Sequence, residues 1–592
     1  MAGGVMPADG NGNDSVVLPA STAASDTATR WSVALAAAAL AGCSGGGSDS
    51  GSGLSSSASS SSSTTNTGID DTQAARFLLQ AQFSASDSDI TAVKSQGYAN
   101  WLNNQFARPQ GQTGVAWLDS QGYNAIKSDQ SYFWPQFGDF MIWNQLLTAP
   151  DQLRKRIALA LSECFVVSLS PIDGFWPPYM IAAYWDVLVS NAFGNFRTLL
   201  EKVTLNAAMG FFLNTRGNLK EDAATGREPD ENYAREVMQL FTIGLYELNL
   251  DGTNKLNGNG DPIETYSQSD ITNLAHVFTG YDYDYSRVTW TPVSWVNYAI
   301  PSNEFALDPM AFNAANHSTL AVTFLGATIP ANTSGPDALR MALDTLFNHP
   351  NAGPFFAKQM IQRLVTSNPS PAYVQRVATA FNDNGAGVRG DLKAVWTAIL
   401  TDSEARAAPD VANAFSGKLR EPMLRLVQWA RIAEVTSSNG KYEIYDLSAA
   451  DTNLGQSPLR SPSVFNFFRP GYVPPNSAIG SNGLRAPEFQ LVNETTIAGY
   501  ANFMQWMTRG GYNDVRPTYS SLLPLAHDLP TLLARLNLYF TANQLSASTI
   551  TGIQTALATL GVTASSNTAD KSYLVSTACY LILCSPEYLV QK

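Results

Sequence analysis

Apolar residues recur at every third or fourth position along most of the chain from residue 69 onward, which is the spacing of one face of an α-helix. Helix-start residues precede two of these stretches, because Asp151 stands before Gln152 and Ser269-Asp270 stands before Ile271. The pattern predicts helices over residues 73–83, 98–106, 152–167, 338–347, 355–365, 371–381, 392–400, 418–433 and 574–583.

Strand signals are confined to the middle of the chain. Residues 248–256 predict a small β-hairpin with a turn at Asp251-Gly252. Residues 288–300, which include Trp290, Trp295 and Tyr298, predict one or two more short strands. Strands do not alternate with helices, which argues against a doubly wound parallel sheet. We therefore expect a mainly α fold, a large multi-helix body with one small β-hairpin or strand insertion near residues 248–300.

A short apolar run near the amino end, residues 31–42, suits the hydrophobic region of a signal peptide. The run is too short to span a bilayer, which takes about 20 residues. It ends in Leu40-Ala41-Gly42-Cys43, which resembles the lipobox of bacterial lipoproteins, where the chain is cut before the cysteine and the thiol is acylated. The alternative is an Ala-rich helix that ends at a Gly turn and buries the thiol. The segment that follows favours lipidation of Cys43.

Residues 44–68 are almost entirely Ser, Gly, Thr and Asn, a composition that cannot bury apolar surface and predicts a flexible tether. The stretch 1–29 is longer and less basic than the start of a usual signal peptide. This indicates either a start codon placed too far upstream or a genuine longer leader. We expect a leader and signal peptide at 1–42, the lipobox cysteine and tether at 43–68, and a helical domain at 69–592. The mature protein is then an extracytoplasmic protein of the cell envelope, held on the membrane through a lipid anchor only.

The charge balance narrows the function classes. Asp and Glu number 49 against 36 Lys and Arg, which gives a formal net charge of -13, and charged residues make up only 14% of the chain. A nucleic-acid binder needs a basic face that neutralises phosphates, so we expect no nucleic-acid partner. The same charge argues against electrostatic docking onto anionic lipids.

Three further cysteines and two Gly-rich stretches have ordinary structural interpretations. Buried free thiols are favoured for Cys164, Cys579 and Cys584, with a bridge from Cys164 to one of the others as the alternative. The Gly-x-Gly-x-x-Gly stretch at 385–390 joins two predicted helices and lacks the preceding strand of a dinucleotide site. Residues 257–261 lack the late Glu of a calcium loop. We expect polar turns at both stretches.

One polar cluster could carry chemistry. We expect Glu228-Pro229-Asp230-Glu231 to open a helix that runs to Leu245. On that helix Glu231 and Arg235 are four residues apart and can pair, and Glu236 lies beside them. The neighbouring face is apolar, so we expect Arg235 to be largely buried in a structural network with at least one carboxylate. Its candidate further partner is Asp270, at the start of the next helix.

The segment around Glu231 and several others resemble the domain-of-unknown-function family number 1800, a family of exported bacterial proteins. The resemblance rests on Glu-Asn-Tyr-Ala-Arg-Glu at 231–236, on Leu-Phe-Thr-Ile-Gly-Leu at 240–245, and on further segments along the chain. These further segments are residues 74–78, 195–200, 270–281, 349–360 and 461–472.

The resemblance implies a large, mostly helical exported protein without an established activity. Genes of this family often lie beside those of a second exported family, domain of unknown function 1501, which resembles alkaline phosphatases and sulfatases. A protein of that kind is therefore a possible partner. Where the family often has His-Asp, this chain has His317-Ser318, which weakens the idea of a His-Asp catalytic pair.

Two functions from different classes follow. The preferred one is a binding or assembly protein that holds an exported partner or a surface polymer, with Trp- and Tyr-rich loops over 281–298 that could stack on sugars; core packing is the alternative role of those aromatic residues. The second is a hydrolase that uses Glu231, Glu236, Asp270 and His317 as catalytic candidates, the first three also as candidate ligands of a divalent metal. Unpaired carboxylates in a cleft would favour the hydrolase, and a closed network would favour structure.

Overall fold

The structure is a computed structural model that describes residues 68–592, except 412 and 414. The described residues all belong to one compact unit. The predicted leader, the lipobox with Cys43, and the tether up to residue 67 lie outside the described residues.

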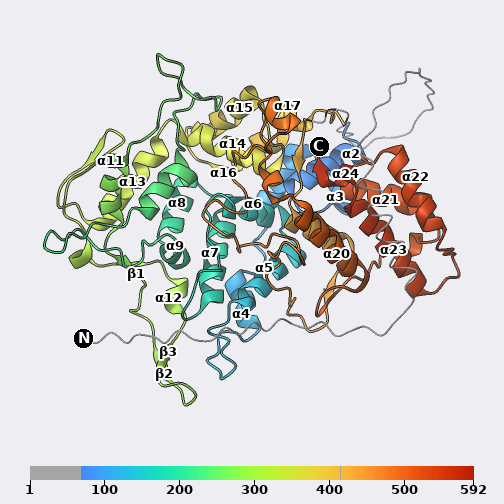
Figure 1. The fold of residues 1–592 in the computed structure, drawn as a ribbon, viewed down its shortest axis with the longest axis horizontal. Helices are drawn as coiled ribbons and strands as arrows, with labels where there is room; N and C mark the ends of the chain where they lie inside the picture. The colour runs from blue at the N-terminus through green and yellow to red at the C-terminus, as the bar shows by residue number, and fades with distance from the viewer. Residues whose placement is uncertain (1–67, 412, 414) are drawn as a thin grey trace. The chain divides into compact units, whose positions relative to one another are not determined.

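The expected mainly α fold is confirmed (Figure 1). The helices in the first half are α2 (Asp71–Ala81), α3 (Asp87–Ala107), α4 (Gly114–Ser120), α5 (Gln136–Thr148), α6 (Gln152–Ser162), α7 (Pro177–Asn191), α8 (Phe196–Thr204), α9 (Ala207–Phe212), α10 (Asn232–Glu236), the π-helix η1 (Val237–Thr242), α11 (Gln268–Ala275) and η2 (His276–Phe278). They continue with α12 (Glu304–Leu307), η3 (Ala314–Asn316), α13 (Gly335–Asn348), α14 (Ala352–Leu364), α15 (Pro371–Asn382), α16 (Leu392–Thr401), α17 (Ser403–Arg406), α18 (Pro422–Ile432), α19 (Ala478–Ser481), η4 (Pro487–Leu491), α20 (Glu494–Gly510), η5 (Leu523–Leu525), α21 (Leu529–Thr541), α22 (Ala547–Ala558), α23 (Thr568–Leu583) and α24 (Pro586–Leu589).

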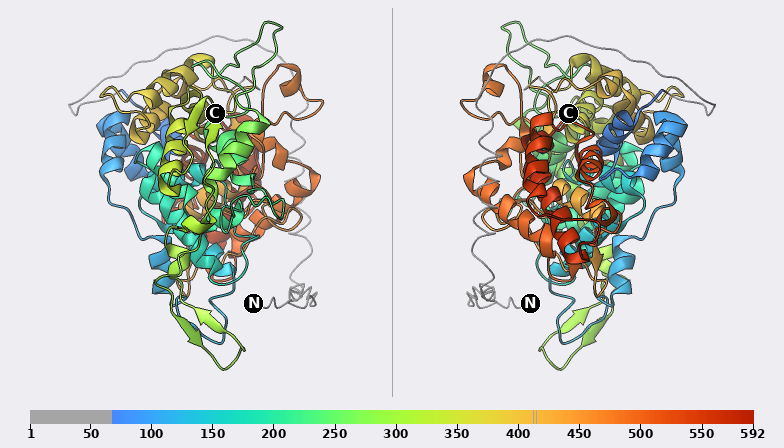
Figure 2. Two further views of the ribbon diagram at one scale, coloured as in Figure 1. Left: turned by 90° about the vertical axis from the view of Figure 1, so that its left-hand side faces the viewer. Right: turned by 90° about the vertical axis from the view of Figure 1, so that its right-hand side faces the viewer.

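Helix α7 lies at the centre of the amino-terminal half and packs against α4, α5, α6, α8, α9 and α12. Nearly all of its side chains are buried, including Tyr184 and Trp185, because other helices cover it on all sides. Seen from the two ends, the helices coloured green to yellow gather on one side and α20–α23 on the other (Figure 2). Among these, α20 packs on α23, and α14, α15 and α16 pack in sequence order.

In the described residues, each sheet consists of two antiparallel strands. The pairs are β1 (Tyr281–Asp282) with β4 (Ala311–Phe312), β2 (Trp290–Pro292) with β3 (Ala299–Pro301), β5 (Val322–Phe324) with β6 (Ala327–Ile329), β7 (Lys418–Leu419) with β10 (Val590–Gln591), and β8 (Thr436–Ser437) with β9 (Val515–Arg516). The predicted strands near 288–300 are confirmed as the hairpin β2–β3, in which Thr291 faces Ile300. The predicted hairpin at 248–256 is present as one bridge, between Leu248 and Asn254.

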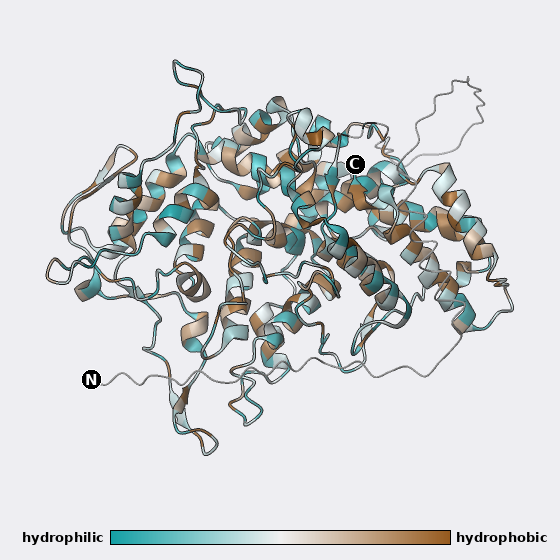
Figure 3. Ribbon diagram, viewed as in Figure 1, coloured by the Kyte–Doolittle hydropathy of each residue, from teal (hydrophilic) through white to brown (hydrophobic). Residues whose placement is uncertain are grey.

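Many helices carry both hydrophobic and hydrophilic residues along their length (Figure 3). In the described part of the chain, no helix is both long and apolar enough to cross a membrane. Cys164, Cys579 and Cys584 are buried free thiols, so the alternative bridge from Cys164 does not form.

Two predicted helices are shorter than expected, for local reasons. The helix expected over 418–433 is split, because Pro422 starts α18 and the residue before a proline disfavours helical backbone; Glu421 is accordingly extended, and Lys418 lies in β7. The helix expected over 152–167 ends at Ser162, and Glu163 takes the cap position.

The Gly-rich stretch at 385–390 forms the expected turn between α15 and α16. Gly390 has a φ of +74° and lies against the Phe347 ring, where a Cβ would come within 2.7 Å of a ring carbon. Gly390 therefore allows the turn to pack closely against Phe347. Helix α15 precedes the stretch, where a dinucleotide site would have a strand.

Candidate functional site

The helix with the family-like segment begins later than expected and changes type halfway. Residues 228–230 are not helical; α10 begins at Asn232 and passes into the π-helix η1 at Val237. A π-turn widens the helix and leaves carbonyls free for partners outside it, and such turns are frequent at functional sites. Leu240 and Thr242 lie in this widened turn.

Arg235 lies at the surface rather than in the interior. Its side chain is 38% exposed and donates to Glu231 Oε2 at 3.0 Å. Glu231 also accepts hydrogen bonds from Gln268 at 2.8 Å and Thr272 at 2.7 Å, both on α11. The carboxylate partner is confirmed, but the expected burial is wrong, because the pair lies on the outer side of the α10–α11 contact.

Asp270 is not a partner of Arg235. It is the third residue of α11 and forms a capping box with Ser267, while its other oxygen accepts from the Leu325 backbone N–H at 2.8 Å. Among the described residues, no hydrogen bond or ion pair joins Asp270 to Glu231, Arg235 or Glu236. The sequence suggested Asp270 as the residue just before a helix, but the cap is Ser267.

Glu236 is the most unusual carboxylate of the predicted cluster. It is buried, at 6% exposure, and its Oε2 has no hydrogen-bond partner. Burial raises the pKa of Glu236 to about 7, and the nearby charge of Arg235 only partly opposes this shift. Burial, together with the charge of Glu236, raises the pKa of Tyr266 to about 12. A group with a pKa near neutrality can exchange a proton at physiological pH.

His317 lies apart from this cluster and is buried, with its ring against Phe312. Its Nδ1 lies 3.0 Å from the Thr279 carbonyl oxygen, and burial lowers the pKa of the imidazole. His276 is its neighbour and contacts Glu221 through Nδ1 at 3.1 Å. The structure thus brings His317 close to His276 and Glu221, a carboxylate that the sequence analysis did not single out. Within the described residues, no three His, Cys, Asp or Glu side chains are placed to hold a metal ion.

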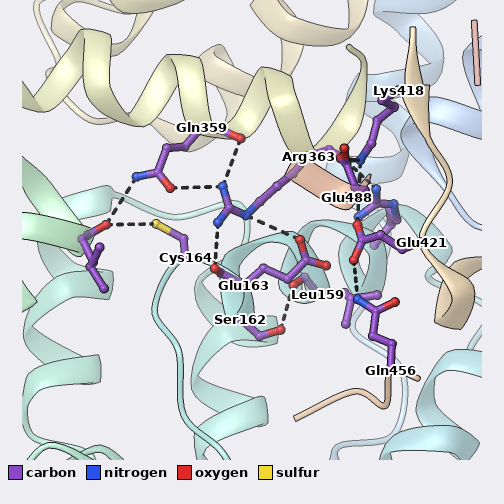
Figure 4. A network of polar contacts seen from close by, with 12 residues as sticks. Leu159, Ser162, Glu163, Cys164, Gln359, Arg363, Lys418, Glu421, Gln456 and Glu488 are labelled. Carbon is purple, nitrogen blue, oxygen red and sulfur yellow. Dashed lines mark hydrogen bonds and ion pairs between the residues drawn. The ribbon is translucent and has the colours of Figure 1, made fainter. Parts of the chain in front are cut away.

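A larger polar network lies in the interior and was missed by sequence reasoning (Figure 4). It starts at the Leu240 carbonyl in the π-helix, which accepts from the Gln359 amide at 3.3 Å and faces the Cys164 thiol at 3.8 Å. Gln359 Oε1 accepts from Arg363 Nη1 at 3.1 Å, and Arg363 Nη2 donates to the Glu163 carbonyl at 2.7 Å. The network therefore connects the π-helix η1 to α14 and to the end of α6.

The other half of the network pairs buried charges. Lys418 Nζ lies 3.1 Å from Glu488 and 3.8 Å from Glu421, and Glu421 accepts from Gln456 at 2.7 Å. Burial raises the pKa of Glu163 to about 8, with a further rise from the charge of Glu421, against the opposing charge of Arg363. A signal in the sequence existed: Arg156 and Glu163 interrupt the apolar pattern of one helix, and Arg363 that of another.

Exposed aromatic side chains on the hairpin β2–β3 and in other loops are grouped here as the aromatic surface; the hairpin itself lies at the lower edge of Figure 1. We use this name for six side chains that are each more than 40% exposed: Phe133, Trp134, Tyr285, Trp290, Trp295 and Tyr298. The surface spans separate segments, because Trp295 donates to the Tyr132 hydroxyl at 3.2 Å and the Tyr298 ring contacts Phe175. Core packing is confirmed for Tyr281 and Tyr283, which are buried, whereas Trp290, Trp295 and Tyr298 lie largely at the surface.

Comparison with known proteins gives one match. A family model described as "Protein of unknown function (DUF1800)" covers residues 76–590. Searches of curated proteins and of solved structures each found no match.

Proposed function

Since the chain belongs to the DUF1800 family, whose description assigns no activity, we propose a function from its surface: a lipid-anchored protein of the cell envelope that binds a neutral polysaccharide through the aromatic surface. The single observation that carries this proposal is the exposure of six large aromatic side chains around one hairpin. Large exposed rings cost free energy in water, which a ligand or partner that covers them recovers, and exposed apolar patches mark interaction sites.

The arrangement of the rings supports a sugar polymer as the ligand. Exposed aromatic faces stack on the C–H faces of pyranose rings, and nearby polar groups can hold the hydroxyls. Asp129 and Asp173 lie exposed in the loops that carry Trp134 and Phe175. With a net charge of -13 on the chain, an acidic polymer would be repelled, which favours a neutral one.

The anchor is the second part of the proposal and rests on the sequence. The lipobox ending at Cys43 and the Ser- and Gly-rich segment after it would place the folded body at the end of a tether outside the membrane. An exported phosphatase- or sulfatase-like protein of domain-of-unknown-function family 1501 is the partner that the resemblance favours. A tethered polymer-binding protein would hold such a partner close to its substrate.

The metal-assisted hydrolase remains the second candidate, and one residue favours it. Glu236 is a buried carboxylate with an unpartnered oxygen and a pKa of about 7. Glu231 and Asp270 do not share its environment. Glu231 is bonded to Thr272 of α11, and Asp270 to the cap residue Ser267 and to Leu325 in the turn between β5 and β6. The candidate carboxylates therefore do not converge on one point, and binding has the stronger support.

The experiment that tests binding is co-sedimentation of the purified full chain with insoluble neutral polymers, namely chitin and cellulose. We expect the wild-type protein to be retained by at least one of them. The double variant Trp290→Ala, Trp295→Ala should bind roughly tenfold more weakly, since each ring contributes about 0.5–1.5 kcal/mol.

The matched control is Trp506→Ala, because Trp506 is 50% exposed but lies on α20, away from the hairpin residues. This variant should bind as the wild type does. Retention by neither polymer, or equal weakening by the control, would overturn the proposal. An acidic polymer, alginate, should not retain the protein.

A further inference from the structure

A small cavity lies next to Glu163, between the end of α6, the start of α18 and the loop 457–467. Its walls include Leu159, Ser457, Ser461, Asn466 and Phe467. The space is about the size that one water molecule requires. The loop that closes the cavity includes Ser461, the first residue of the segment 461–472 that resembles the family.

Four of the lining side chains carry buried polar atoms without a hydrogen-bond partner. These atoms are both carboxylate oxygens of Glu163, the hydroxyls of Ser457 and Ser461, and the amide nitrogen of Asn466. Each of the four residues is at least nine-tenths buried, with exposures of 4%, 0%, 4% and 9%. Arg363 Nε lies 3.5 Å from Glu163 Oε2, an ion-pair contact that leaves the carboxylate without a hydrogen bond.

Unsatisfied polar groups are rare in protein interiors, and here four gather around one void. A single occupant could satisfy them only if it both donates and accepts, because the Asn466 amide nitrogen donates and Glu163 keeps an accepting oxygen whether or not it is protonated. A metal ion cannot accept the amide hydrogen, and an anion cannot donate to the carboxylate. A water molecule meets both needs and fits the space.

We propose that this cavity is a binding site for one ordered water molecule, which bridges Glu163 to Ser457, Ser461 and Asn466 and so holds the loop 457–467 on helix α6. The water would add to the ion pair between Arg460 and Asp139 at 2.7 Å, which already holds this loop on α5. Leu459 has a φ of +57°, a left-handed conformation that a leucine rarely adopts. The water also links the loop to the Arg363 network, since Glu163 belongs to both.

A high-resolution crystal structure of the full chain, grown in the presence of rubidium chloride, tests this site directly. We expect one density peak in the cavity, at about 2.7–3.2 Å from Glu163, Ser461 and Asn466, without rubidium anomalous signal. An empty cavity would overturn the proposal. A peak with rubidium signal would also overturn it, because the occupant would then be a cation bound to the oxygens.

A pair of variants gives an independent measurement. Ser461→Ala removes one partner of the water, whereas Val464→Ala changes a half-buried apolar residue of the same loop that does not line the cavity. We expect proteolysis within residues 457–467 to become several-fold faster in the first variant and to stay at the wild-type rate in the second. Equal rates for Ser461→Ala and the wild type would contradict the role assigned to the water.

Discussion

Two buried glutamates have different charged neighbours, but the pKa of each is raised by burial. Glu163 lies among Arg363, Arg156 and Lys418, whose positive charges oppose the effect of burial, yet its pKa is still raised to about 8. Glu236 has only Arg235 nearby and a pKa of about 7. In both residues burial outweighs the neighbouring charge, so both carboxyls hold a proton near neutral pH more readily than an exposed glutamate does.

The raised pKa of Glu236 predicts a pH-dependent stability. The folded protein binds this proton more tightly than the unfolded chain, so the contribution of Glu236 to stability falls as pH rises from about 4.5 to about 7. Glu236→Gln removes the ionisation and should raise the free energy of unfolding at pH 8 by roughly 1–2 kcal/mol, with little change at pH 4. Urea unfolding at the two pH values measures this.

Glu231→Gln is the matched control for Glu236→Gln. Hydrogen bonds from Thr272 and Gln268, with the charge of Arg235, lower the pKa of Glu231, so its contribution is present at neutral pH and is lost in acid. This variant should be less stable than the wild type at pH 8. A loss of stability at pH 8 in Glu236→Gln as well would mean that the carboxylate makes a stabilising contact.

Two arginines separate an exposed ion pair from a buried one. Arg235→Ala removes a pair whose side chains are 38% and 30% exposed, and it should cost about 0–1 kcal/mol of unfolding free energy. Arg363→Ala removes the guanidinium from a fully enclosed network and should cost about 3–5 kcal/mol, because Glu163 and Gln359 lose their partner. Chemical denaturation of both variants gives the comparison, and similar losses would refute the distinction.

At the scale of elements, Gly280 decides how two segments meet. It follows η2, has a φ of +83°, and a Cβ there would lie 2.7 Å from the Asn313 carbonyl oxygen and 3.1 Å from the His317 Cβ. The glycine therefore allows the segment with His317 to pack directly against the end of η2. This packing brings His317 to Thr279, which bonds its Nδ1.

Gly280→Ala should therefore destabilise the protein by roughly 1–3 kcal/mol, through the left-handed backbone and the clash. Gly258→Ala is the control, since that glycine has no atom within 4 Å of the added carbon and no positive φ. Its stability should stay within about 0.5 kcal/mol of the wild type in thermal unfolding. Equal effects of the two substitutions would show that the backbone at Gly280 relaxes freely.

Helix periodicity predicted helices such as α2, α6, α13 and α23, because the buried face of a surface helix repeats every three to four residues. It did not predict α5 or the central helix α7, which are buried on nearly all sides and have no polar face, nor α20, α21 and α22. Where a helix was predicted, the errors lie at its ends, where local chemistry decides. Pro422 splits one predicted helix, Ser267 rather than Asp270 caps another, and α10 begins at Asn232 instead of Glu228. The π-helix has no periodic signature in six residues, so the sequence could not predict it.

At the scale of the whole molecule, the interior network could not be predicted because its members are distant in sequence. Glu163 and Arg363 are 200 residues apart, and Lys418 meets Glu488 from a further segment. Sequence spacing locates partners within one helix, as it did for Glu231 and Arg235, but not across helices. The exposure of the aromatic residues near 281–298 was likewise undetermined, since aromatic residues serve both cores and binding surfaces.

The proposed anchor predicts how the whole molecule is distributed in the cell. Cys43→Ser should abolish acylation and yield a soluble or unprocessed form, because the thiol is the atom that carries the lipid. Membrane fractionation and intact mass of the protein measure this, and Cys164→Ser is the control because Cys164 is a buried thiol of the folded body. An unchanged mass and distribution in Cys43→Ser would contradict the anchor.

The central claim, that the aromatic surface binds a neutral sugar polymer, is tested most directly by hydroxyl-radical footprinting of the full chain with and without chitohexaose. The account predicts that Trp134, Trp290, Trp295 and Tyr298 lose reactivity when the oligosaccharide is present. Trp506 and Tyr246, which are 50% and 42% exposed elsewhere on the molecule, should react as before. Unchanged reactivity around the hairpin, or equal protection of Trp506, would contradict the account.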